Sequence, residues 1–287
     1  MDESILEIKN LNKTYDKFKL CDVSLKLPRG YIMGFIGANG AGKTTTIKLI
    51  MNMIQRDSGE INVFGKDNIK YELQIKDKTG YVGETPVFYD DMTVGWTANF
   101  ASKFYSNWDN ELFNQLLTKF NIDKNKKISQ LSKGMKMKTG LVLALSHHPE
   151  LLILDEPTSG LDPIVRDELL DILLEFIQDE RRGVFFSSHI TSDIQKIADF
   201  VTFIDNGKII LSEEKDIVLD NWKLIKGDID RVCDYKDDLI GLQMTRTNFK
   251  AIVKDIESFK ARHDTSSIVI DNASLDDILL HLVRKEN

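Results

Sequence analysis

The sequence predicts an α/β fold with a mostly parallel core sheet, an N-terminal antiparallel β subdomain, a helical insertion and a small C-terminal α+β appendage. Three observations support this prediction. A glycine-rich run at residues 37–44 follows an apolar segment and precedes a helical pattern. Apolar runs at 151–154 and 183–186 have the length and composition of buried parallel strands. After about residue 212 the pattern changes to short strands separated by helical pieces.

The N-terminal part of the chain predicts strands and one helix. Residues 5–9 and 23–27 alternate apolar and polar side chains, which is typical of half-exposed strands. A turn at 28–30 leads into a nearly continuous apolar run at 31–36, which predicts a buried strand. The same reasoning predicts a helix over 44–54 and a short strand, closed by a glycine, over 58–65.

The middle of the chain predicts a helical subdomain over about residues 85–140. Its apolar side chains recur at helical spacing, as Leu112, Leu116 and Phe120 do. Asn206 and Gly207 then separate two strand-like runs, which is a strong hairpin signal.

The C-terminal region predicts four strands, at 222–225, 239–244, 249–253 and 267–270, and a helix at 274–284. We therefore divide the chain into a domain at 1–212 and an accessory α+β region at 213–287. The accessory region is either an extension that packs on the core, which we favour, or a dedicated ligand domain.

Composition excludes several classes of protein. The chain has 287 residues, 42% of them hydrophobic, so it can bury a large core and is not disordered. Its net charge of −7 argues against nucleic acid as a partner, because phosphate contacts need clustered Lys and Arg. Cys21 and Cys233 show no metal-ligand spacing and are expected to be reduced thiols in a cytosolic protein. No apolar stretch reaches the ~18 residues of a membrane span, so we expect a soluble chain that docks to any membrane partner.

The run at 37–44 matches the P-loop pattern without deviation, so the predicted fold class is that of a P-loop NTPase. Its glycines let backbone N–H groups approach phosphate oxygens, and the following helix adds its positive end. Lys43 supplies charge for the β- and γ-phosphates, the Thr44 hydroxyl is a candidate Mg²⁺ ligand, and Thr45 is a donor to the α-phosphate. The predicted ligands are ATP and Mg²⁺, and the predicted phosphate-binding set is Gly37, Asn39, Gly40, Ala41, Gly42, Lys43, Thr44 and Thr45.

Two further runs place reactive side chains at strand ends. Asp155 ends an apolar strand and is predicted to hold Mg²⁺. Glu156 follows it and is the candidate general base or water-positioning group. His189 follows the run at 184–188 and is the candidate γ-phosphate contact. His147 and His148 lack a partner pattern, and we interpret them as structural.

In this order and spacing, the motifs resemble those of the nucleotide-binding subunit of an ABC transporter, over about residues 4–212. Residues 131–135, Leu-Ser-Lys-Gly-Met, are similar to the family's signature motif, and residues 159–162 to the loop whose Asp crosses the dimer interface. The resemblance implies that Ser132 and the Gly134 amide bind a γ-phosphate held by the opposing subunit, with Asp162 at the interface. It also implies that Tyr15, or else Phe18, stacks on adenine.

The resemblance further implies an Mg²⁺-dependent ATPase that pairs head to tail with itself or a paralogous ATPase. It implies integral membrane permease subunits as partners, and a cytoplasmic location, peripheral on the inner face of the cell membrane. Glu84 stands where the family usually has a Gln that links Mg²⁺ to the transmembrane partner; Lys133 and Met135 also depart from the family pattern. These departures resemble those of small bacterial exporters with separate ATPase and membrane chains.

Three alternatives stay open at this point. Residues 85–104, with Phe88, Tyr89 and Trp96, either dock a membrane partner or fill the core of the helical subdomain. The chain as a whole is alternatively a soluble ABC ATPase associated with ribosomes or DNA. A GTPase or small-molecule kinase that shares only the P-loop is a third alternative, although the chain lacks the Asn-Lys-x-Asp guanine motif.

Overall fold

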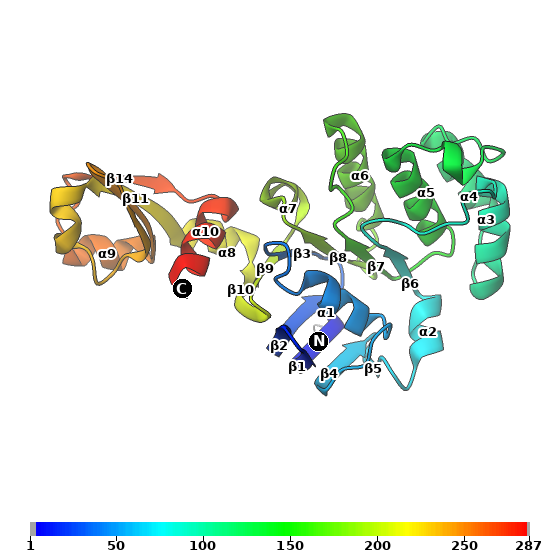
Figure 1. The fold of residues 1–287 in the computed structure, drawn as a ribbon, viewed down its shortest axis with the longest axis horizontal. Helices are drawn as coiled ribbons and strands as arrows, with labels where there is room; N and C mark the ends of the chain where they lie inside the picture. Colours follow the sequence, from blue (N-terminus) through cyan, green and yellow to red (C-terminus); the bar gives the residue numbers. More distant parts are fainter. Residues whose placement is uncertain (1–3, 286–287) are drawn as a thin grey trace. The chain divides into compact units, whose positions relative to one another are not determined.

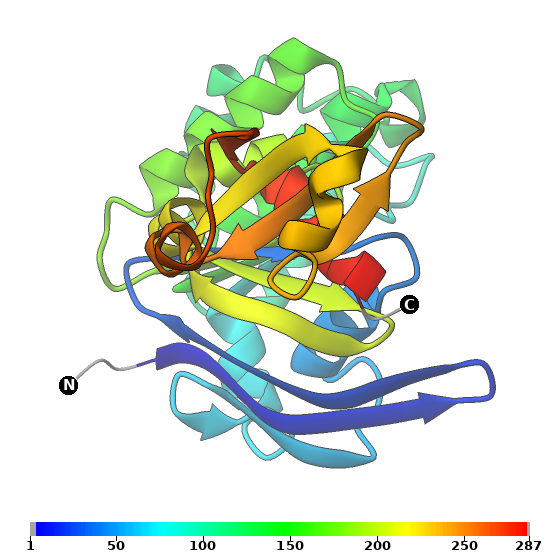
Figure 2. The same cartoon turned by 90° about the vertical axis from the view of Figure 1, so that its left-hand side faces the viewer.

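The computed structural model describes residues 4–285, and the chain divides into two compact units between Ile209 and Ile210. The first unit begins with an antiparallel sheet in the order β2-β1-β4-β5. Its strands are β1 (Ser4–Tyr15), β2 (Phe18–Pro28), β4 (Ser58–Val63) and β5 (Lys66–Asp67). The hairpin of β1 and β2 is long (Figure 2), with pairs from Ser4 and Pro28 to Tyr15 and Phe18. This sheet confirms the predicted antiparallel β subdomain.

A six-stranded sheet forms the centre of the first unit, in the order β10-β9-β3-β8-β7-β6 (Figure 1). Five of these strands, β9, β3, β8, β7 and β6, pair in parallel with one another. Every residue of β3 and β7 is buried, as expected for strands covered on both faces. The strand bounds are β3 (Ile32–Ile36), β6 (Thr79–Val82), β7 (Leu151–Asp155), β8 (Gly183–Ser188), β9 (Phe200–Asp205) and β10 (Lys208–Glu214).

Seven α-helices belong to the described part of the first unit, and α3, α4 and α5 lie together as the predicted helical insertion (Figure 1). The helix predicted over 44–54 is shorter, because it ends at Ile50 and Asn52 takes a left-handed φ of 52°. The helices are α1 (Lys43–Ile50), α2 (Glu72–Asp77), α3 (Val94–Ala101), α4 (Asn110–Lys119), α5 (Lys133–Leu145), α6 (Pro163–Phe176) and α7 (Thr191–Ile197), with 3-10 turns at Ser102–Phe104 and Ile128–Gln130.

The second unit has an antiparallel sheet in the order β12-β13-β11-β14. Along the chain, β11, a 3-10 helix, β12, β13, α9 and β14 follow one another, which is the strand–helix–strand–strand–helix–strand arrangement of ferredoxin-like folds. This arrangement confirms the predicted α+β appendage. Its elements are α8 (Lys215–Asn221), β11 (Trp222–Asp228), a 3-10 helix (Ile229–Asp234), β12 (Ile240–Met244), β13 (Asn248–Lys254), α9 (Ile256–Arg262), β14 (Ile268–Asn272) and α10 (Leu275–Lys285).

The second unit buries a core of its own on one face of this sheet, made by Ile225, Val232, Tyr235, Phe249, Val253 and Phe259. Across both units, no helix within residues 4–285 has the length and apolar character needed to cross a membrane.

Candidate functional site

A polar cavity of about 620 Å³ lies where the loops after β3, β6, β7 and β8 meet. In a parallel sheet these carboxyl ends share one edge, which is where ligands bind in α/β proteins. The volume is in the usual range for a small-molecule site. The cavity is lined by Lys17, Phe18, Asn39, Gly40, Gly42, Lys43, Thr44, Thr45, Glu84, Glu156, Ser159 and His189.

The glycine-rich loop is shaped by backbone conformations and contacts that only glycine allows. Gly40 and Gly42 have φ of +83° and +117°, in the left-handed region. A Cβ atom on Gly37 would lie 2.4 Å from the carbonyl oxygen of Ile204, on β9. The loop therefore rests directly against the sheet, and α1 begins at its end with Lys43. This arrangement directs the first turn of α1 toward the cavity, where it favours an anion.

Lys43, Glu156 and His189 form a chain of contacts at the wall of the cavity. The Lys43 ammonium donates to the carbonyl oxygens of Gly37 (2.6 Å) and Ala38 (3.1 Å), and lies 3.0 Å from Oε1 of Glu156. The other carboxylate oxygen, Oε2, lies 2.7 Å from Nδ1 of His189 and accepts from its backbone N–H at 3.3 Å. The side chains of Lys43 and Glu156 are only 5% and 7% exposed, so this ion pair is almost fully desolvated.

Glu156 is held in an unusual backbone conformation. Its φ of 50° lies in the left-handed region, which residues other than glycine rarely adopt. Its backbone N–H donates to both the carbonyl and the hydroxyl oxygen of Ser187, each at 3.1 Å. Such strain concentrates at functional sites, where neighbouring contacts hold it.

Asp155 is 2% exposed and is not one of the residues that line the cavity; its carboxylate accepts a hydrogen bond of 2.7 Å from the Ser187 hydroxyl. Thr44 and Glu84 line the cavity and carry oxygen atoms, the type of donor that Mg²⁺ prefers. Among residues 4–285, no three His, Cys, Asp or Glu side chains are grouped closely enough to hold a metal by themselves.

The signature-like residues do not line this cavity; they cap or support helices nearby. The Ser132 hydroxyl accepts from the Met135 N–H (3.2 Å) at the start of α5, and Gly134 lies in the first turn of that helix. Asp162 is the N-cap of α6 and accepts from the N–H groups of Ile164 and Val165.

Lys133 connects the signature-like segment to the loop that contains Ser159. Its ammonium donates to the Ser159 carbonyl oxygen at 2.7 Å. A Cβ atom on Gly160, which has a φ of +68°, would lie 2.9 Å from that ammonium. Gly160 therefore leaves room for the Lys133 ammonium.

Of the two aromatic residues considered for adenine, Phe18 lines the cavity. Tyr15 is on the other side of the turn between β1 and β2 and is 45% exposed. The Lys13 ammonium lies 5.6 Å from its ring centroid. Sequence reasoning missed Lys17 and Ser159 as lining residues and Ser187 as the partner of both acids. The sequence could have indicated Ser187 as a site residue, because it lies at the end of a predicted strand, two residues before His189.

Residues 20–159 match the family model described as ABC transporter. The bacitracin transport ATP-binding protein BcrA of Bacillus licheniformis is 35% identical over 210 residues, which cover 72% of this chain and 69% of that protein. The lantibiotic transport ATP-binding protein SrtF of Streptococcus pyogenes is 37% identical over 216 residues, which cover 74% of this chain and 92% of that protein.

Solved structures agree with this fold. A structure described as the ATP-binding subunit of an ABC transporter superposes with a TM-score of 0.69 at 30% identity, covering 75% of this chain and 92% of the other. The structure of cbiO1 from Clostridium perfringens has a TM-score of 0.64 at 24% identity and covers 75% of this chain and 90% of the other. At this identity it supports the fold alone.

Proposed function

The chain belongs to the ABC transporter family as an ATP-binding subunit, and from this premise we propose that it is the Mg²⁺-dependent ATPase of an exporter with separate membrane chains. The observation that carries the ATPase part of the proposal is the position of Glu156, whose buried carboxylate joins the Lys43 ammonium to His189 at the cavity wall. ATP binding and hydrolysis follow from the family. The Mg²⁺ dependence, the residue roles and the direction of transport are the proposed parts.

In this proposal the backbone of residues 37–42, with Lys43 and Thr45, holds the phosphates. Thr44, Asp155 and Glu84 are the candidate Mg²⁺ ligands, and the ion would neutralise charge on the phosphates. Glu156 positions and deprotonates the attacking water. The His189 ring contacts Glu156 through Nδ1, which leaves its other nitrogen, Nε2, to contact a phosphate oxygen. Phe18 or Tyr15 stacks on the adenine ring.

We further propose that the active form is a head-to-tail dimer, with itself or a paralogous ATPase. Ser132, Gly134 and Asp162 lie outside the cavity that Lys43 and Glu156 line, so one chain supplies two separate half-sites. Two chains related by a two-fold axis complete both sites, and ATP between them favours the closed pair.

The partner we propose is an integral membrane permease that docks on the helical subdomain. Tyr89, Trp96, Phe100 and Phe104 are 61%, 39%, 40% and 67% exposed and form a continuous row of ring contacts. The rings of Trp96 and Phe100 are stacked at 5.4 Å with an interplanar angle of 5°. Exposed aromatic patches of this kind mark protein interfaces.

The proposed location is cytoplasmic, at the inner face of the membrane, with residues 1–212 as the nucleotide-binding domain and 213–287 as the accessory region. Two relatives are named for transport of bacitracin and of a lantibiotic, which supports export. The alternative remains a soluble ABC ATPase on ribosomes or DNA.

The test is an affinity purification of the Glu156→Gln variant, with ATP and Mg²⁺, from detergent-solubilised membranes, read by mass spectrometry. We expect a polytopic membrane protein in stoichiometric yield. Its yield should fall when Trp96→Ala and Phe100→Ala are added, and should not change with Leu73→Ala, another exposed apolar side chain. Recovery of ribosomes, DNA-binding factors or only the chain itself would favour the soluble ATPase.

A further inference from the structure

Lys133, the first residue of α5, uses its charged side chain on a backbone carbonyl group. Its ammonium donates to the Ser159 carbonyl oxygen at 2.7 Å, and within residues 4–285 it forms no ion pair with a carboxylate. Lys136, three residues further along α5, pairs with Asp90 at 3.0 Å. Lys133 is exposed, so water could solvate its ammonium instead. The contact with Ser159 therefore needs an explanation of its own.

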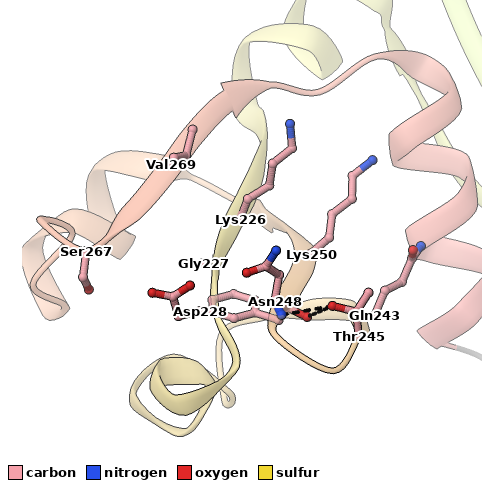
Figure 3. A pocket seen from close by; sticks show the side chains of 10 residues that line it. Lys226, Gly227, Asp228, Gln243, Thr245, Asn248, Lys250, Ser267 and Val269 are labelled. Carbon is pink, nitrogen blue, oxygen red and sulfur yellow. Dashed lines mark hydrogen bonds between the residues drawn. The ribbon is translucent and has the colours of Figure 1, made fainter.

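Lysines that line a cavity in the second unit do have carboxylate partners. Lys226, Lys250 and Asp228 are among the residues that line a cavity of about 550 Å³ on the sheet of that unit (Figure 3). Lys226 pairs with Asp271 at 2.7 Å, and Lys250 pairs with Asp277 at 2.9 Å. Both ammonium groups point away from Asp228 (Figure 3). Carboxylates therefore balance these two charges, whereas the first lysine of α5 is directed at a peptide group.

The acceptor of that hydrogen bond belongs to two overlapping turns that directly follow β7. The Ser159 N–H donates to the Glu156 carbonyl oxygen at 3.1 Å, and the Leu161 N–H donates to that of Thr158 at 3.2 Å. Gly160 has a φ of +68°, a conformation that the third residue of several turn types needs. Ser159 is thus bonded on one side to Glu156 and on the other side to α5.

The start of α5 approaches the same segment at a second place. A Cβ atom on Gly134 would lie 3.4 Å from Val165 and 3.8 Å from Leu161. A Cβ atom on Gly160 would lie 2.9 Å from the Lys133 ammonium. The signature-like segment and the turns after β7 are therefore held together at two neighbouring positions.

We propose that Lys133 is a positioning residue for the Glu156 of its own chain, an inference that rests on the proposed ATPase function. Glu156 and Ser159 line the same cavity, so a shift of the turn changes the position of the carboxylate relative to the attacking water. Glu156 also has a strained φ of 50°, which persists only where neighbouring contacts hold it. Lys133 supplies one of these contacts from α5, through Ser159.

This role within one chain differs from the role of the two neighbours of Lys133 in the sequence. In the proposed dimer, Ser132 and Gly134 bind the phosphate that the opposing subunit holds. Because the three residues are consecutive, Lys133 connects the phosphate contact in one nucleotide site of the dimer to Glu156 in the other.

The first measurement compares ATP hydrolysis by the wild type, Lys133→Met and Lys136→Met. Methionine has no donor, so the kcat of Lys133→Met should fall by about ten-fold, while its KM for ATP changes by less than about two-fold. Lys136→Met is the matched control, because it removes the same charge from the same helix, and its kcat should not change. An unchanged kcat in Lys133→Met, or an equal loss in the control, would overturn the inference. A wild type without ATPase activity would overturn the proposed function, and this inference with it.

Mixed dimers, purified through a different affinity tag on each chain, show in which chain Lys133 acts. One chain, the silent chain, carries Lys43→Ala/Glu156→Gln and should bind no ATP, so hydrolysis uses the Glu156 of the other chain. Lys133→Met in the ATP-binding chain should lower hydrolysis by about ten-fold, and in the silent chain it should have little effect. A loss caused by Lys133→Met in the silent chain instead would mean that Lys133 contacts the phosphate of the opposing subunit, which contradicts the proposal.

A double-mutant cycle tests the contact itself. Gly160→Ala adds a Cβ atom 2.9 Å from the Lys133 ammonium and also strains the backbone at a positive φ. The backbone strain is the same with or without the lysine, so Gly160→Ala should lower kcat at least about three-fold more in the wild type than in Lys133→Met. Equal effects in the two backgrounds would show that the contact between Lys133 and Ser159 does not position the site.

Discussion

The ammonium of Lys43 and Oε1 of Glu156 lie 3.0 Å apart, although 112 residues separate them in the chain. Lys43 begins α1 and Glu156 directly follows β7, so the pair joins the glycine-rich loop to the acidic strand end. Both side chains are almost fully buried, and removal of one partner leaves an uncompensated charge. We therefore expect the same contact to affect both stability and activity.

Lys43→Ala should lower the free energy of unfolding by about 3–5 kcal/mol, because it leaves the buried Glu156 carboxylate unpaired. It should also abolish tight ATP binding. The double variant Lys43→Ala/Glu156→Gln should recover much of the stability but none of the ATP affinity. Urea unfolding and nucleotide binding measure the two effects separately. A Lys43→Ala protein as stable as wild type would show that the ion pair is not important in solution.

Glu156→Gln should keep ATP binding and slow hydrolysis by about 10²–10⁴-fold, because an amide cannot accept the proton of the attacking water. It should also accumulate an ATP-bound dimer. Phosphate release and analytical ultracentrifugation measure these two properties. Glu175→Gln is the matched control, since Glu175 is exposed and forms an ion pair with Lys119 on the surface. Hydrolysis at the normal rate would remove Glu156 from the role of base.

Glu84→Gln should change ATP turnover or its coupling to transport without a loss of folding, since Glu84 is exposed and lines the cavity beside Lys43 and Glu156. Glu84 and Lys133 also line a second cavity of about 210 Å³. We therefore expect the effect of Glu84→Gln on turnover to differ when Lys133→Gly is present, as for interacting charges. Strictly additive effects would mean that the two residues act independently, and an unaltered rate with unaltered transport would exclude a role for Glu84.

Acid should destabilise the protein through His147, a buried residue whose ring stacks on Tyr105 at 3.8 Å. Burial lowers the pKa of His147 from 6.5 to about 4. Between these values the unfolded chain binds a proton that the folded chain does not, so stability falls as pH decreases from 7 toward 4.

Between pH 7 and pH 5, His147 lowers the free energy of unfolding by about 2 kcal/mol. His147→Phe keeps an aromatic ring and should lose that part of the pH dependence, measured by urea unfolding at the two pH values. Equal pH slopes for the two proteins would contradict the assignment.

The sequence predicted most of the elements, because their signals are local. The four strands of the second unit, the hairpin at Asn206 and Gly207, and the loop at 37–44 all follow from side-chain alternation or from glycines at fixed positions. The end of α1 was misplaced by four residues, since Asn52 is a weaker stop signal than glycine and apolar residues continue on both sides of it.

By itself, the sequence determined the fold class and the types of side chain available for phosphate chemistry, because short motifs fix backbone conformation over a few residues. Only the tertiary structure decided that Glu156 is buried between Lys43 and His189, that Ser187 contacts both acids, and that Lys226, Lys250 and Asp228 share a cavity. These contacts join residues far apart in the chain. Their distances depend on strand order and register, which pair segments across the whole unit and leave no local mark in the sequence.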